Sequence, residues 1–105
     1  MLKDICYVLM ESERESLRAS LAIVHTMPRL ETCRVISFWT GETYWFVIAD
    51  SKSSIECQLC GLSFNHMVIT EKAFLSISDH DKGLLLEQCC ICARNGSCSV
   101  ELESL

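Results

Sequence analysis

The sequence predicts a small α+β zinc-finger domain in which an N-terminal helix packs on a short antiparallel sheet. Three observations predict this fold: two Cys-x-x-Cys pairs around a long segment, an apolar stripe at helical spacing, and two β-rich stretches joined by a turn. The chain has 105 residues, half of them hydrophobic, which suits one domain with a small core. We expect a single zinc-binding domain over residues 1–105, with a helix and an aromatic hairpin in 1–54 and the zinc-binding half in 55–98.

The strongest signal is the pair of motifs that bound residues 57–92. Two residues between the cysteines let one tight turn aim both sulfurs at the same point, and Gly61 permits the positive φ that such a turn often needs. Four thiolates complete a tetrahedral Zn²⁺ site and leave no open position for water, so the metal is expected to be structural. The predicted ligands are Cys57, Cys60, Cys89 and Cys92.

Other residues compete for these ligand positions. Cys90 is the nearest competitor, and His66 or His80 could replace one cysteine. Cys98 could join Cys90 or His80 at a second, weaker centre. For both histidines, a surface or hydrogen-bonded side chain without metal is the commoner outcome in proteins.

The eight cysteines suit either a disulfide scaffold or a thiol and metal protein, and the compartment decides between them. The first residues lack the layout of a signal peptide because Asp4 and then Glu11 interrupt it. We therefore expect a reducing compartment with free thiols, and the protein is not expected to be secreted. Cys6 and Cys33 have apolar neighbours and are expected to be small buried hydrophobes. No apolar run approaches the length of a membrane span.

The net charge of −5 argues against attraction to nucleic acid. Residues 1–54 carry six basic and seven acidic groups, whereas residues 55–105 carry three and seven. The zinc-binding half is thus the acidic half, and four thiolates would add further negative charge. The basic groups nearest to one another are more typical of a solvated face than of a phosphate site; they are Arg14, Arg18, Arg29 and Arg34.

The first helix is expected to begin at the capping-box pattern Ser12–Glu15 and to end before Pro28. An apolar stripe follows at helical spacing, and it favours core packing over a self-association face, although a homodimer remains an alternative. Residues 1–10 either open this helix or form a short leading one. The stripe consists of Leu17, Leu21 and Val24.

Two strands are expected at Thr32–Phe38 and Thr43–Ile48, with a turn between them. Alternation would put Tyr44 and Phe46 on one side and Trp45 on the other. One side is expected to be core. The other side could be an aromatic platform for stacking on bases, but packing of both tryptophans in the core against the first helix is the more common arrangement.

The second half begins with a polar connector, Ala49–Ser54, which is the best internal boundary. Thr70 is expected to cap a short helix that runs to Leu75. Residues 79–83 are expected to form a turn. Residues 84–88 are expected to form a strand or a helix, and a strand is favoured because these residues lead into the second cysteine pair. Ser97–Leu102 alternates weakly and ends the fold.

Enzymatic signatures are absent from the sequence. It contains no zinc-deaminase or His-Glu-x-x-His motif, no phosphate-binding glycine loop and no serine elbow. No catalytic residue is therefore predicted, and the protein is not expected to be an enzyme. A thiol redox protein is an alternative because it would also use Cys-x-x-Cys, although here the pair lies past a hairpin, a glycine follows it, and a second pair mirrors it.

The order of these features resembles the small zinc-binding protein encoded at the start of sobemovirus genomes, over residues 15–92. The resemblance lies in the N-terminal helix, the aromatic hairpin from Phe38 to Trp45 and the two separated cysteine pairs. It implies a suppressor of RNA silencing in plants that also supports systemic virus movement. It also implies that Cys57, Cys60, Cys89 and Cys92 correspond to that family's first zinc finger. The family's second, redox-sensitive finger has no counterpart in this sequence.

The function expected on this basis is a zinc-binding viral suppressor that binds a host protein of the silencing pathway or small RNA. The acidic charge favours the host protein. The expected location is the cytoplasm of the host cell, with the nucleus as an alternative, and no membrane partner is expected. A zinc-ribbon-like adaptor for protein–protein interaction and a thiol redox switch are the alternative functions.

Overall fold

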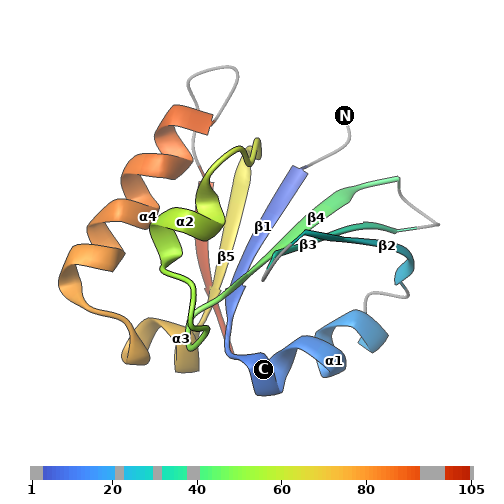
Figure 1. Cartoon of the computed structure of the whole chain (residues 1–105), viewed down its shortest axis with the longest axis horizontal. Helices are drawn as coiled ribbons and strands as arrows, with labels where there is room; N and C mark the ends of the chain where they lie inside the picture. The colour runs from blue at the N-terminus through green and yellow to red at the C-terminus, as the bar shows by residue number, and fades with distance from the viewer. Residues whose placement is uncertain (1–3, 21–22, 30–31, 38–40, 93–98, 105) are drawn as a thin grey trace.

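The computed structural model describes residues 4–20, 23–29, 32–37, 41–92 and 99–104, with side chains except at 18–37 and 90–92. Ten elements follow one another along this part of the chain (Figure 1). They are β1 (Asp4–Leu9), α1 (Glu11–Ser20), β2 (Ile23–Arg29), β3 (Thr32–Ser37), β4 (Thr43–Ile48), α2 (Ile55–Leu59), β5 (His66–Thr70), α3 (Glu71–Ser76), α4 (Asp79–Cys92) and β6 (Ser99–Glu103).

All six strands form one sheet in the order β2-β3-β4-β1-β5-β6. The strands β4, β1, β5 and β6 are mutually parallel, whereas β2 and β3 extend the sheet beyond β4 in antiparallel pairing. Numbered among themselves, the parallel strands have the order 2-1-3-4, and helices lie between them in the chain. The prediction of an α+β zinc finger on a short antiparallel sheet is therefore wrong, and the fold is a Rossmann-like α/β fold.

The central position of β1 explains why the sheet is parallel. Five of its six residues are buried, so the strand has apolar side chains on both faces. A strand of this kind is stable only where neighbouring strands and covering layers surround it, which is the arrangement of parallel sheets. The hairpin strand β4 pairs with β1 along its whole length, from Asp4 opposite Thr43 to Leu9 opposite Ile48. The expectation of a helix in the first ten residues was wrong.

The helices cover the two faces of the sheet unequally. On one face, Leu17 of α1 packs with a cluster that includes Leu9 and Phe46. On the other face, α2, α3 and α4 together contribute buried side chains to a larger cluster. Figure 1 shows α2 and α4 next to each other on one side of the sheet and α1 on the other. No helix in the described part of the chain is both long and apolar enough to cross a membrane.

The first helix begins and ends earlier than the sequence predicted. It begins at Glu11, and the Glu13 carboxylate, not that of Glu15, accepts the Met10 N–H at 2.9 Å. This contact is the glutamate half of a capping box that lies two residues before the predicted one. The stretch expected to complete the helix forms β2 instead, while residues 21 and 22 lie outside the described residues.

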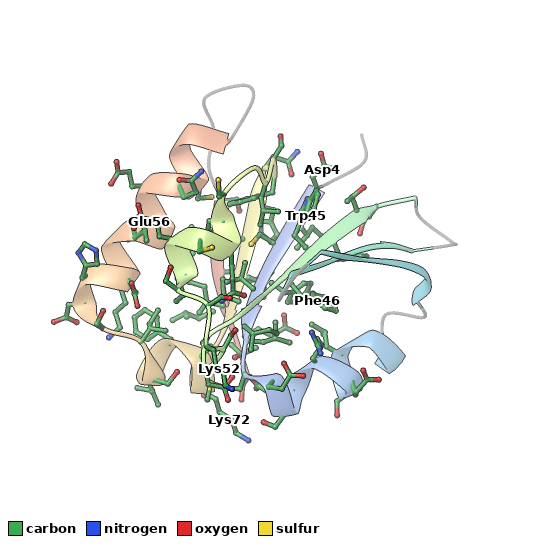
Figure 2. The ribbon with its side chains drawn as sticks, in the orientation of Figure 1. Asp4, Trp45, Phe46, Lys52, Glu56 and Lys72 are labelled. Atoms are coloured by element: carbon green, nitrogen blue, oxygen red, sulfur yellow. The ribbon has the colours of Figure 1, made fainter. Side chains whose placement is uncertain are left out.

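The predicted hairpin strands are confirmed as β3 and β4, which pair antiparallel. Tyr44 and Phe46 face the α1 side, and Trp45 packs against the cluster on the α2 side, so that Trp45 and Phe46 lie on opposite faces of β4 (Figure 2). Both faces of β4 are therefore core, and Tyr44 and Phe46 are not available as a platform for bases. The expected packing of Trp45 against the first helix is wrong, because α1 covers the opposite face, and Trp39 lies outside the described residues. Gly41 has a φ of 70°, as a residue in the connecting turn requires, and most of that turn lies outside the described residues.

The predicted cap of the short helix α3 is confirmed, because the Thr70 hydroxyl accepts the Ala73 N–H at 3.3 Å. The turn expected at 79–83 and the strand expected at 84–88 are both wrong, since these residues form α4. Ser78 begins this helix by accepting the Asp81 N–H at 3.1 Å. Leu85 and Cys89, four residues apart on the same helical face, are then both buried.

Candidate functional site

In open α/β sheets, the crevice between the carboxyl ends of two neighbouring parallel strands is the first place to look for a ligand site, and the corresponding strands here are β1 and β5. In open parallel sheets, ligands bind where the helices that follow two adjacent strands leave toward opposite faces. Here α1 follows β1 onto one face, and α3 follows its neighbour β5 onto the other. The exposed side chains of Lys52 and Lys72 lie at this same end of the molecule (Figure 2).

The protein's own side chains close this crevice. The Thr70 hydroxyl donates a 2.7 Å hydrogen bond to the Glu13 carboxylate, which also accepts the Met10 N–H. Thr70 is fully buried and Glu13 is nearly so. The next amide of α1, that of Glu11, donates to the Asp50 carboxylate at 2.9 Å. Carboxylates therefore accept the N–H groups of Met10 and Glu11 at the start of α1.

These contacts bear on chemistry because a helix N-terminus after a parallel strand is the usual position for a bound phosphate. The loop from β1 to α1 contains only Met10 and has no glycine for a close approach of the backbone to an anion. The carboxylates of Glu13 and Asp50 would repel a phosphate at this position. The crevice does not fit a nucleotide, and its hydrogen bonds instead link the start of α1 to Thr70 at the end of β5 and to Asp50 after β4.

The first cysteine pair lies at α2: Cys57 is within the helix, and Cys60 follows its last residue. The side of the helix that faces the core is formed by residues other than the cysteines. Gln58 and Leu59 are buried, while Cys57 and Cys60 are exposed and free. Cys60 is the C-cap of the helix, and its N–H donates to the Cys57 carbonyl oxygen at 3.3 Å. The expected positive φ after the second cysteine is confirmed at Gly61, where φ is 81°. Both thiols thus lie on the solvent side of a short helix.

The buried Gln58 side chain fixes this helix to the sheet. Its amide oxygen accepts the Ile48 N–H at 2.8 Å, and its amide nitrogen donates to the Ile48 carbonyl oxygen at 2.9 Å and to the Ser53 carbonyl oxygen at 3.1 Å. The described pairing of β3 with β4 ends at Cys33 opposite Phe46. Gln58 therefore satisfies backbone groups of Ile48 beyond the end of that pairing.

The second cysteine pair is divided between the core and residues whose side chains lie outside the described ones. Cys89 is fully buried on α4, and its thiol donates to the Ser99 carbonyl oxygen at 3.7 Å. This contact needs a protonated thiol, whereas zinc binds a thiolate. The side chain of Cys92, like those of Cys90 and Cys98, is not described.

Within the described side chains, no group of three or more His, Cys, Asp or Glu residues is arranged to hold a metal ion. Cys57, Cys60 and Cys89 are not brought together in this way. His66 is half-buried, with its Nε2 3.3 Å from a carboxylate oxygen of Glu101, and His80 is exposed on α4. The four-cysteine site stays a prediction because the structure does not describe the side chain of Cys92.

A cluster of tyrosine and glutamate side chains lies on the α1 side of the sheet. The ring centroids of Tyr7 and Tyr44 are 6.0 Å apart, and the Tyr44 hydroxyl donates to a Glu42 carboxylate oxygen at 2.7 Å. Burial raises the pKa of Tyr7 from 10.0 to about 12, with smaller contributions from the negative charges of Glu103, Glu101 and Glu42. The neutral phenol is therefore the stable form in the fold.

Because of Tyr7, we expect the stability of the fold to fall as the pH rises above 10.0, the ordinary pKa of a tyrosine. Tyr7 ionises near pH 10 in the unfolded chain and near pH 12 in the fold, so its contribution is complete below pH 10 and is lost as the pH rises toward 12. Unfolding by urea should show a steeper loss of stability in this window for the wild type than for Tyr7→Phe. Phenolate absorbance gives a second measurement, because the only other tyrosine is Tyr44. Identical pH profiles for the two proteins would contradict the raised pKa.

The large exposed apolar side chains of the described residues all lie in the C-terminal third of the chain. Their exposed fractions are 81% for Leu75 on α3, 51% for Leu86 on α4, and 37% and 54% for Val100 and Leu102 on β6. Every residue of β6 except Glu103 is exposed. Exposed apolar side chains on neighbouring elements are typical of interaction surfaces.

Sequence reasoning missed the residues that organise this part of the fold. Glu13 and Gln58 are polar residues that had no assigned role, although Glu13 stands three residues after Met10 and Gln58 stands three residues after the buried Ile55. The capping-box spacing and the helical spacing are the signals that could have identified them. No sequence signal distinguished the exposed Leu75 and Leu86 from core leucines.

The fold and these contacts define a class: a Rossmann-like α/β protein in which its own side chains fill the place where such folds usually bind a ligand. Comparisons of the chain with protein-family models, with curated proteins and with solved structures find no match.

Proposed function

We propose that the protein acts by binding a partner protein through its C-terminal third, without catalysing a reaction. The observation that carries the proposal is the exposure of Leu75, Leu86, Val100 and Leu102 on the three consecutive elements α3, α4 and β6. Exposure of these apolar side chains to water is unfavourable in free energy, and burial against a partner would remove this cost.

The charge of the protein supports a protein partner over a nucleic acid. The net charge is −5, and β6 itself carries Glu101 and Glu103. Binding to a phosphate backbone depends on clustered lysine and arginine. The surface of β6 is acidic instead, so it offers no comparable attraction to a nucleic acid. A partner with basic side chains around an apolar contact fits both the charge and the leucines.

The closed crevice supports a role in binding in preference to catalysis. The hydrogen bonds of Glu13 and Thr70 occupy the place where folds of this class usually bind a nucleotide or substrate. The buried positions of these two residues suit a structural link better than a reactive pair, because each already has its partner.

The more specific function, suppression of RNA silencing with support of virus movement, rests on the sobemovirus resemblance alone. Binding of a host silencing protein in the host cytoplasm would agree with the surface described above. The zinc-finger fold that the sequence predicted is wrong, and the proposed binding does not depend on zinc. A silencing reporter in leaf tissue tests this function, and unaltered silencing would contradict it.

The predicted zinc site has a direct test. Protein purified without chelators should contain one zinc per chain if Cys57, Cys60, Cys89 and Cys92 are ligands, and chelation should lower its thermal stability, since structural zinc contributes to folding. Cys57→Ser should then lose the metal, whereas Cys6→Ser should keep it. Substoichiometric zinc in the wild type would overturn the site.

The proposed interaction is tested by affinity capture from an extract of the cells in which the protein is native. The test variant is Leu75→Ser with Leu86→Ser, and the matched control is Lys72→Ser with Glu87→Ser on the same two helices. All four side chains are exposed, so each substitution should change stability by no more than about 0.5 kcal/mol. The wild type and the control should enrich the same proteins, and the test variant should lose them.

Equal enrichment by the test variant and the wild type would overturn the proposal. A second arm titrates short duplex RNA at two salt concentrations. Salt-dependent binding of RNA, with no protein lost from the test variant, would replace the protein partner by RNA.

A further inference from the structure

The strand β6 is an open edge of the sheet. It pairs with β5 on one side, and within the described residues no strand pairs with its other side. An edge strand presents unpaired N–H and C=O groups along that side. Its five residues, Ser99–Glu103, contain no proline and pair with β5 without a register shift.

The opposite edge, β2, differs in a way that makes β6 the better acceptor. Pro28 lies within β2 and has no backbone N–H. The pairing of β2 also has an irregularity between Ile23 and His25. Proline and bulges are two of the features that protect natural sheet edges from pairing, and β6 has neither, although it carries the charged side chains of Glu101 and Glu103.

The two faces of β6 have different chemistry. Val100 and Leu102 are opposite Met67 and Ile69 of β5, and therefore face the α2 side of the sheet. Glu101 is opposite Val68 and faces the α1 side, as does Glu103. The contributions of both glutamates to the raised pKa of Tyr7 agree with this placement.

These faces argue against a second copy of the chain as the added strand. The antiparallel register that pairs all five residues of β6 with the same five residues of another copy places the two Glu101 carboxylates directly opposite each other. Like charges in directly opposite positions destabilise a strand pair. The favourable partner strand has the opposite charge on this face and apolar side chains on the other.

We propose that β6 binds an extended segment of a partner protein as a seventh strand, and that this segment alternates lysine or arginine with apolar residues. The basic side chains would lie beside Glu101 and Glu103 on the α1 side, and the apolar side chains would cover Val100 and Leu102. Backbone hydrogen bonds give such strand addition its affinity, and the alternating side chains give its specificity. This inference rests on the proposed role in partner binding and names its site and the chemistry of its ligand.

The experiment uses the full chain and a short fluorescent peptide in which lysine alternates with valine. The matched control peptide has glutamate in place of lysine, and a third peptide carries N-methyl groups along one edge. The lysine peptide should bind about tenfold more tightly than the glutamate peptide. Its affinity should fall as salt is added. The N-methyl peptide should not bind, because it cannot complete the strand pairing.

A charge-reversed variant tests the placement of the peptide. Glu101→Lys with Glu103→Lys should reverse the preference in favour of the glutamate peptide. The control, Glu56→Lys with Glu87→Lys, changes the net charge equally at exposed positions on α2 and α4 and should keep the original preference. Amide hydrogen exchange should show new protection in β6 and not in β2 when the lysine peptide is bound to the wild type.

Several results would overturn the inference: equal binding of the N-methyl peptide, an unchanged preference in the charge-reversed variant, or no binding of the lysine peptide. Protection of β6 by self-association without peptide would replace the partner segment by a second copy. The capture experiment with Leu75 and Leu86 is independent of β6. Loss of peptide binding with intact capture would therefore remove only the edge-strand site and not the role in partner binding.

Discussion

Replacement of Gln58 by alanine is expected to lower the free energy of unfolding by about 3 kcal/mol. The substitution removes the partners of the Ile48 N–H and carbonyl groups and of the Ser53 carbonyl group. Gln58 is buried, so water cannot replace these hydrogen bonds without entering the space between α2 and β4. The helix that carries Cys57 and Cys60 would lose its main polar link to the sheet.

Urea unfolding of the wild type and of Gln58→Ala measures this effect. Glu56→Ala is the matched control because Glu56 is the exposed neighbour on the same helix, and it should change stability by about 0.5 kcal/mol or less. Gln58→Met, which keeps the length of the side chain but forms no such hydrogen bonds, should be nearly as destabilising as alanine. A loss below about 1 kcal/mol for Gln58→Ala would contradict the bonded arrangement.

The second large effect is expected at the link between the two helix starts. Glu13→Ala should cost about 2–3 kcal/mol, because it leaves the buried Thr70 hydroxyl and the Met10 N–H without their acceptor. Glu13→Gln keeps an oxygen that can accept both hydrogen bonds and should cost less than about 1 kcal/mol. The comparison separates the hydrogen bonds from the packing of the side chain.

A double-mutant cycle with Thr70→Val measures the coupling between Glu13 and Thr70. The single change at Thr70 also removes the cap of α3, so it should be destabilising by itself. The pair should show a coupling energy of about 1 kcal/mol, because the hydrogen bond between the Thr70 hydroxyl and the Glu13 carboxylate forms only when both side chains are present. Strict additivity of the two changes would contradict the 2.7 Å contact.

The local features that the sequence predicted correctly are those determined by neighbouring residues. The strands β3 and β4, the opposite faces of Trp45 and Phe46, the cap at Thr70 and the positive φ at Gly61 all follow from short-range patterns. The burial of Cys6 is confirmed, and the side chain of Cys33 lies outside the described residues.

The order of the strands could not be predicted, because a short apolar run does not distinguish a buried strand from part of a helix. The residues of β1 form a nearly continuous apolar stretch, which suits a strand buried on both faces as well as part of a helix. The two cysteine pairs favoured a zinc finger. The segment between them contains β5, which the sequence analysis did not predict. In α4, the interpretation of 84–88 as a strand came from the supposed metal site, although Ser78 and Asp81 supply an ordinary helix start.

The candidate site was harder to predict than the fold because its residues come from distant parts of the chain. Glu13 and Thr70 are 57 residues apart, and Gln58 meets Ile48 across a turn between two elements. Their meeting depends on the order of the strands, which the sequence did not reveal. The cysteines could be recognised by spacing alone, yet the spacing of Cys57 and Cys60 also fits the outer side of a helix whose inner side is Ile55, Gln58 and Leu59.

The central place of β1 has a consequence for synthesis of the protein. This strand is synthesised before its two neighbours in the sheet, β4 and β5, which begin only at Thr43 and His66. The strand β1 therefore remains unpaired until these neighbours have been made, and loop closure over such separations slows folding. Nascent chains stalled before His66 would expose one edge of β1. We expect a chaperone to bind most strongly to chains at this stage of synthesis.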